Sequence, residues 1–265
     1  MLRYISQAKM LESLRQTQIR DLSNDDSGKI TIVTSHYMIR FLLPPLLAAF
    51  HERYSGVHIE LIDVGSKEAN ALFGEGNADL CISPIKIESA NVACWPIYQD
   101  SFLFCVPNRV LPEKDIVYYE GSTYGEYLSK HSPAFIDINI LRDVPFITLE
   151  AGSGTYSHFK NIFDDARITP QVFQTVEQIS TANALANSGL GATLTSKPLV
   201  WYTMNSQKVT FFQYDSPRMS RNFYLMFYRS RYISKAVRNF LEICKEHIAS
   251  ELPGYQYKYN LYDEK

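Results

Sequence analysis

The feature that most constrains the fold is an alternation of β-branched runs with helical patterns after residue 28. Residues 29–35 predict a strand, residues 37–56 a helix, and residues 57–63 a second strand. Residues 66–76 and 78–83 add a helix and a third strand. Strands that alternate with helices form parallel sheets with helices on their faces, so this part predicts a βαβαβ unit.

The alternation starts again in the middle of the chain, so a second unit of the same kind is expected. Further strands and helices are predicted at 92–98, 101–107, 145–150, 154–165, 171–177, 179–189, 190–196, 221–230 and 234–252. We therefore predict an α/β fold of two Rossmann-like lobes with a cleft. Lobe I comprises 28–107 plus 213–252, and lobe II comprises 108–212.

Three local features complete this outline. Residues 2–22 predict a polar helix with a thin apolar stripe, and residues 1–27 are expected to form a linker helix and a break. Pro44 and Pro45 stand inside a helical pattern and predict a kink or a break there. Residues 253–265 are expected to be a polar, aromatic C-terminal tail.

Composition excludes some classes of function. The net charge of −2 argues against a basic nucleic-acid-binding face on this chain. An apolar segment of about 18 residues is absent, which argues against a transmembrane helix. The N-terminus lacks a signal-peptide pattern, so a cytoplasmic protein is expected. Cys81, Cys94 and Cys105 stand in apolar runs and predict small buried side chains.

The stretch AGSGT at residues 151–155 joins a predicted strand to a predicted helix. It does not match the G-x-S-x-G of a nucleophile elbow, the G-x-G-x-x-G of a dinucleotide loop or a P-loop. The sequence HERYS at 51–55 lacks the second histidine of a zinc-protease helix. We therefore predict no catalytic residue, no metal site and no cofactor.

The remaining function for this corner is binding of a small anion. Ser153 or Thr155 would cap the helix, and the free N–H groups and helix dipole at such an end favour a carboxylate. A cap that serves only stability is the alternative. Similar corners follow other predicted strands, at Ser35, Ser66, Ser83, Thr181 and Thr195.

The order of these segments resembles the effector-binding domain of LysR-type transcriptional regulators. The resemblance covers about residues 28–250. It is carried by LLPPLLAAFHERYSGVHIEL, the NADLCI strand, the glycine corner, GLGATLTS and the last strand and helix. Residues 2–22 resemble the end of the family's linker helix, and the winged helix-turn-helix of the family is missing from this chain.

The resemblance implies a fold like that of type 2 periplasmic binding proteins, with a small effector between the lobes. By position it implies effector contacts at Ser35, His36, Ser66, Ser153, Thr155 and Thr195, and it places Ser83 in a segment that passes between the lobes. Thr181 is a candidate contact only because it lies at a corner after a predicted strand. It also implies self-association as a dimer or tetramer, and DNA binding only through the missing module. No membrane partner is implied.

Two other classes share this fold. A solute-binding protein of a transporter would normally carry a signal peptide and would have no use for a linker helix. An enzyme would need a cluster of catalytic side chains, and the sequence offers none. A ligand-responsive regulatory domain is therefore the leading hypothesis.

Overall fold

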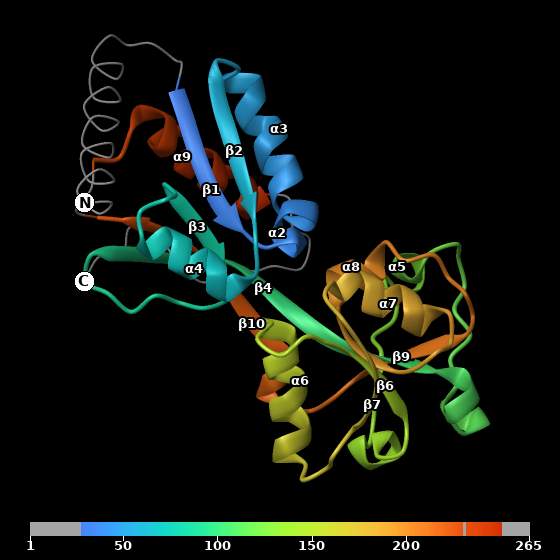
Figure 1. The fold of residues 1–265 in the computed structure, drawn as a ribbon. Coiled ribbons are helices and arrows are strands. Elements are labelled where there is room, and N and C mark those ends of the chain that lie inside the picture. The colour runs from blue at the N-terminus through green and yellow to red at the C-terminus, as the bar shows by residue number, and fades with distance from the viewer. Residues whose placement is uncertain (1–27, 230–231, 251–265) are drawn as a thin grey trace. The chain divides into compact units, whose positions relative to one another are not determined.

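The computed structural model describes residues 28–229 and 232–250, and the chain divides into two compact units (Figure 1). Unit 1 holds the chain up to Tyr98 and from Phe223 onward, and unit 2 is Gln99–Asn222. The sequence placed the two crossings near residues 107 and 212. The units instead divide within two strands, β4 (Val92–Pro107) and β10 (Ser220–Tyr228). The expected linker helix and C-terminal tail lie outside the described residues.

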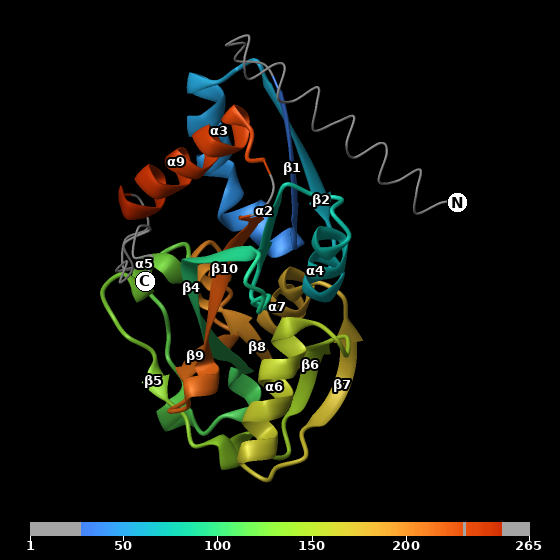
Figure 2. The same cartoon turned by 90° about the vertical axis from the view of Figure 1, so that its left-hand side faces the viewer.

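Unit 1 contains the first predicted βαβαβ alternation. β1 (Gly28–Thr34) pairs in parallel with both β2 (Val57–Asp63) and β3 (Leu80–Ser83), and β10 runs antiparallel to β3. α3 (Leu43–Arg53) and α9 (Lys235–Ser250) pack side by side, as Figure 2 shows. α4 (Ser66–Gly74) packs on β1 and β3, where Phe73, Val33 and Cys81 share one apolar cluster.

The helix predicted over 37–56 is two helices, α2 (His36–Phe41) and α3. Leu42 separates them, and Pro44 and Pro45 stand in the first turn of α3. Proline is tolerated there because the first N–H groups of a helix have no intrahelical acceptor. The predicted break is confirmed.

Unit 2 places helices on both faces of its strands. β6 (Pro145–Leu149) runs parallel to β7 (Gln171–Val176) and is bridged in parallel to the segment that leads into β8 (Thr193–Ser196). β8 and β9 (Val209–Gln213) both pair antiparallel with β4. Phe104 of β4 belongs to the apolar cluster of α6 (Gly154–Asp165), whereas its neighbour Cys105 belongs to a second cluster. Successive residues of a strand point to opposite faces, so this strand is covered on both sides.

The helices on the second face of unit 2 are shorter. They are α5 (Tyr124–Leu128), α7 (Ile179–Asn187) and α8 (Lys197–Trp201). Elements that the sequence did not predict are α5, α8, β9, β5 (Ala134–Phe135) and the 3₁₀ helices η1 (Asn108–Val110), η2 (Glu113–Asp115), η3 (Ile138–Leu141) and η4 (Pro217–Met219). The helical segments have five residues or fewer and β5 has two, so they are too short to show a helical or strand period.

The two strands predicted at 92–98 and 101–107 are one continuous strand, β4. Gln99 and Asp100 stand between the two predicted segments. In the structure Gln99 is exposed, while Asp100 is fully buried and ion-paired with Arg221. A polar residue inside a strand needs no turn when a partner from elsewhere in the chain satisfies it.

The structure explains why the GLGATLTS segment has a glycine at position 191. A Cβ built on Gly191 would lie 2.7 Å from the carbonyl oxygen of Pro145, on the neighbouring strand β6. Two backbone bonds hold this approach, from Ile147 N to Ala192 O at 2.8 Å and from Ala192 N to Pro145 O at 2.8 Å. Only glycine permits the two backbones to come this close.

Candidate functional site

The carboxyl ends of the three parallel strands of unit 1 lie at one edge. Thr34 at the end of β1 is in register with Asp63 of β2 and Ile82 of β3. The residues that follow these ends are therefore neighbours along that edge, which is where α/β sheets bind ligands. Four of the predicted effector contacts lie there, Ser35, His36, Ser66 and Ser83.

Ser35 and His36 begin the first helix of this edge. Ser35 is the N-cap of α2, and its half-buried side chain makes no cap hydrogen bond. The exposed ring of His36 lies with Nδ1 at 2.9 Å from Oδ2 of Asp63, so the carboxylate of β2 orients this histidine.

Ser66 and Ser83 occupy different environments. Gly65 caps α4 and the half-buried Ser66 is its first residue. Ser83 is fully buried, and its hydroxyl accepts a hydrogen bond from Ile85 N at 3.1 Å. Ser83 lies within unit 1 and not in a crossing between units, because the chain leaves unit 1 at Tyr98.

In unit 2 the glycine corner forms the strand, turn and helix start that the sequence predicted. Gly152 has φ of 108°, a backbone conformation that glycine adopts without strain. Ser153 is the N-cap of α6, and its hydroxyl accepts a hydrogen bond from Tyr156 N at 3.0 Å. Within the described part of the chain, the N–H groups of Gly154 and Thr155 have no hydrogen-bond partner.

The end of β8 lies at the same edge as the glycine corner. Phe146 of β6 bridges in parallel to Ala192, just before β8, so the carboxyl ends of the two segments lie together. Thr195 is fully buried on β8, and its hydroxyl has no hydrogen-bond partner among the described residues. Ser196, the N-cap of α8, is likewise buried and unpartnered there. An unsatisfied buried hydroxyl costs about 1–3 kcal/mol, so these two groups favour contact with a ligand or water.

Ser196 was missed at the sequence level, although it directly follows the predicted contact Thr195. The signal was available, because a serine between a strand end and the proline-containing start of a helix is a typical N-cap. Thr181 is less favourably placed. It is an exposed residue within α7, whose N-cap is Gln178, and its N–H donates to Gln178 O at 3.0 Å.

Thr155 leads to a group that the sequence did not predict. Its side chain is buried, and its hydroxyl accepts a hydrogen bond from Nη1 of Arg221 at 3.1 Å. Arg221 also donates from Nη2 to Oδ2 of Asp100 at 2.9 Å. Asp100 and Arg221 are 121 positions apart in the chain, so no local pattern connects them. The signal in the sequence is weak, because Asp100 stands between the polar residues Gln99 and Ser101.

The described residues offer no group of three histidine, cysteine or carboxylate side chains that could hold a metal ion. Burial raises the pKa of Cys81 to about 12 and raises the pKa values of Cys105 and Cys244 further. Thiols in such environments are poor nucleophiles. The predicted burial of Cys81 and Cys105 is confirmed, whereas Cys94 is only partly buried.

No helix among the described residues is long and apolar enough to span a membrane. The carboxyl-end edges of unit 1 and of unit 2 each carry hydroxyl groups and helix starts, and the edge of unit 1 also carries the oriented His36. Such groups hold a small polar ligand by hydrogen bonds.

Comparison with known proteins identifies the relatives of this chain. The family model described as "LysR substrate binding domain" matches residues 23–249. An uncharacterised HTH-type transcriptional regulator of Bacillus subtilis, YcgK, is 25% identical over 250 residues, which cover 92% of this chain and 75% of that protein. The HTH-type transcriptional regulator Cbl of Klebsiella aerogenes is 26% identical over 195 residues, 73% of this chain and 56% of that protein.

A solved structure shows the same fold. The effector-binding domain of QuiR in complex with shikimate has a TM-score of 0.66 at 18% identity, covering 85% of this chain and 99% of that chain. The predicted α/β fold, of the type 2 periplasmic-binding-protein class, is confirmed by this likeness.

Proposed function

The chain belongs to the family of LysR substrate-binding domains, and from this premise we propose that it binds a small carboxylate-bearing effector at the glycine corner of unit 2. The resemblance stated from the sequence is confirmed by the match over residues 23–249. The relatives are named as transcriptional regulators and not as transport receptors or enzymes, which supports a regulatory role.

One observation carries the carboxylate assignment. The first turn of α6 contains no acidic residue, and the N–H groups of Gly154 and Thr155 are left without partners in the described chain. A helix start of this kind attracts negative charge through its dipole and its free donors. The buried hydroxyls of Thr195 and Ser196 at the same edge supply two further hydrogen-bonding groups for the effector.

Regulation follows from differential binding. An effector that binds one conformation of the domain more tightly than another shifts the population toward it by that difference in affinity. We propose that the full regulator transmits this shift to a DNA-binding module outside this chain, and that the domain self-associates as a dimer. Sedimentation equilibrium of the purified chain tests the second point, and a monomer at tens of micromolar would contradict it.

A thermal-shift screen of the purified chain tests the binding proposal. The panel contains small carboxylates, amino acids and aromatic acids, with shikimate included because the domain of QuiR was solved with it. A ligand at one hundred times its Kd adds about 2.7 kcal/mol of stability and therefore raises the Tm. The proposal would be contradicted if no carboxylate in the panel raised the Tm.

A further inference from the structure

A buried ion pair in unit 2 is attached to the first turn of α6. The guanidinium of Arg221 donates to Oδ2 of Asp100 from Nε at 3.1 Å and from Nη2 at 2.9 Å. The side chains of Arg221 and Asp100 are 8% and 0% exposed. The remaining terminal nitrogen, Nη1, donates to the hydroxyl of Thr155 at 3.1 Å. One guanidinium thus joins β4 and α6 to its own strand, β10.

We propose that Arg221 is a positioning residue for the effector corner: it fixes the first turn of α6 on β4 and β10 through Asp100 and Thr155. The inference rests on the proposed function for its consequence, effector affinity, but the contacts themselves are independent of it. Thr155 then acts through its hydroxyl bond to Arg221. Ser153 faces the effector together with the N–H groups of Gly154 and Thr155, which have no partner within the described part of the chain.

The chemistry of the three groups suits this role. A guanidinium has a rigid planar fork, so it can bond a carboxylate and a hydroxyl at once in fixed directions. It also lies over the ring of Phe102, 4.7 Å from the ring centroid, which limits its rotation. A buried cation beside the positive end of a helix is unfavourable by itself. Asp100 neutralises the guanidinium, so Arg221 can lie beside α6 without an unfavourable charge. We call the group Asp100, Arg221 and Thr155 the clamp.

The position of the clamp in the chain gives it a second consequence. Asp100 and Arg221 lie just inside unit 2, next to the two points where the chain passes into unit 1. β4 and β10 continue through these points as unbroken strands. These contacts therefore tie the first turn of α6 to the two strands that lead from unit 2 into unit 1.

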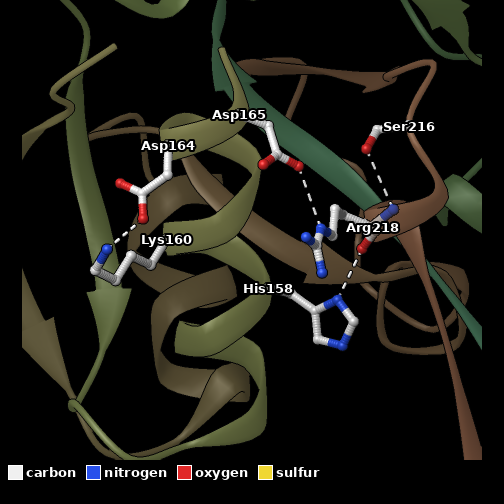
Figure 3. Close-up of polar contacts among 6 residues, drawn as sticks. All are labelled: His158, Lys160, Asp164, Asp165, Ser216 and Arg218. Atoms are coloured by element: carbon white, nitrogen blue, oxygen red, sulfur yellow. Dashed lines mark hydrogen bonds and ion pairs between the residues drawn. The ribbon is translucent and has the colours of Figure 1, made fainter. Parts of the chain in front are cut away.

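The chain supplies a matched control at the other end of α6. Arg218, on η4 before β10, donates from Nε to Oδ2 of Asp165, the last residue of α6, at 3.2 Å. The backbone carbonyl of Arg218 accepts a hydrogen bond from Nδ1 of His158 at 2.8 Å. Figure 3 shows both contacts between this segment and α6. The Arg218–Asp165 pair is about half exposed and far from the first turn.

Amide hydrogen exchange tests the clamp without any ligand. Thr155→Val removes the hydroxyl but keeps its shape and leaves the ion pair intact, whereas Arg221→Met removes the guanidinium. Both should speed exchange at Tyr156 and Ser157 by about tenfold or more and leave the last turn of α6 near the wild-type rate. Arg218→Met should speed exchange in the last turn of α6 and leave Tyr156 and Ser157 near the wild-type rate. If Arg221→Met fails to fold, the proposal is judged on Thr155→Val alone. A wild-type exchange rate in the first turn of α6 of that variant would overturn the proposal.

A titration with the effector probe adds a readout that a purely structural role would not move. The probe is shikimate or the strongest carboxylate of the thermal-shift panel. Thr155→Val and Arg221→Met should each lower the affinity of the domain for the probe. The double variant should bind the probe as tightly as the single variant of lower affinity, because Arg221 acts through Thr155. Additive losses would overturn the positioning role. If no carboxylate binds wild type, the proposed function fails, while the exchange experiment still decides the clamp.

Discussion

The hydroxyl of Ser153 lies 3.0 Å from the backbone nitrogen of Tyr156 and accepts its hydrogen bond, which closes the first turn of α6. The same serine stands directly after Gly152, the turn residue with positive φ, and directly before Gly154 and Thr155, whose N–H groups have no partner among the described residues. Cap and proposed effector corner are therefore one structure, and a substitution at Ser153 tests both roles.

Ser153→Ala should lower the free energy of unfolding by about 1 kcal/mol, the usual cost of losing a side-chain cap. It should also weaken carboxylate binding, because the first turn frays and loses a hydroxyl. Thr123→Ala is the control, since Thr123 caps α5 through Glu126 N, away from the glycine corner. Urea unfolding and titration measure the two effects. Equal losses of affinity in both variants would leave Ser153 as a cap only.

Gly191→Ala should destabilise unit 2 by about 1–3 kcal/mol, in the range of overpacking in a tight core. The new Cβ would stand 2.7 Å from the Pro145 carbonyl, and neither strand backbone can move without breaking the bonds between them. Gly74→Ala is the matched control, because a Cβ at that position would have no heavy atom within 4 Å. Denaturant unfolding compares the variants, and equal stability would show that the β6 backbone yields at no cost.

His158 should make stability fall as the pH falls. Burial lowers its pKa from the ordinary value of 6.5, and the positive charges of Arg221 and Arg218 lower it further, while its bond to the Arg218 carbonyl raises it. The unfolded chain therefore binds the proton first, so its contribution is complete above pH 6.5 and is lost as the pH drops toward the folded pKa.

The comparison of Tm at pH 8 and pH 5 measures this effect. His158→Gln should show a shallower loss of Tm on acidification than wild type. The exposed histidine His51 provides the control, and His51→Gln should keep the wild-type slope. A wild-type slope in His158→Gln would contradict the assignment.

Thiol reactivity should separate the four cysteines. Cys94 is half-buried and donates from Sγ to Ile87 O at 3.3 Å. Burial raises the pKa of its thiol, and the nearby charges of Lys86 and Arg229 offset only part of that rise. Cys81, Cys105 and Cys244 are buried more deeply. Ellman's reagent at neutral pH should modify one thiol slowly in the folded protein and four after denaturation. Cys94→Ala should abolish the slow reaction, and persistence of that reaction would refute the assignment.

Much of the local structure follows from residues that are neighbours in sequence. The helix at 154–165 and the strand at 57–63 were predicted with the bounds that the structure shows. Their signals are a period of side chains, a capping serine and a glycine turn, all of which act within a few residues. The order of these segments was also enough to indicate the family, which the match over residues 23–249 confirms.

The tertiary structure decided what depends on distant partners. The continuity of β4 could not be predicted, because Asp100 looks like a break until Arg221 is placed beside it. Likewise, a local pattern cannot tell that Thr195 and Ser196 carry hydroxyls without partners in the described chain, or that Gly191 touches β6. Sequence periodicity fixes which face of an element is apolar, but ion pairs, close approaches and buried hydroxyls arise only where chain segments far apart in sequence meet.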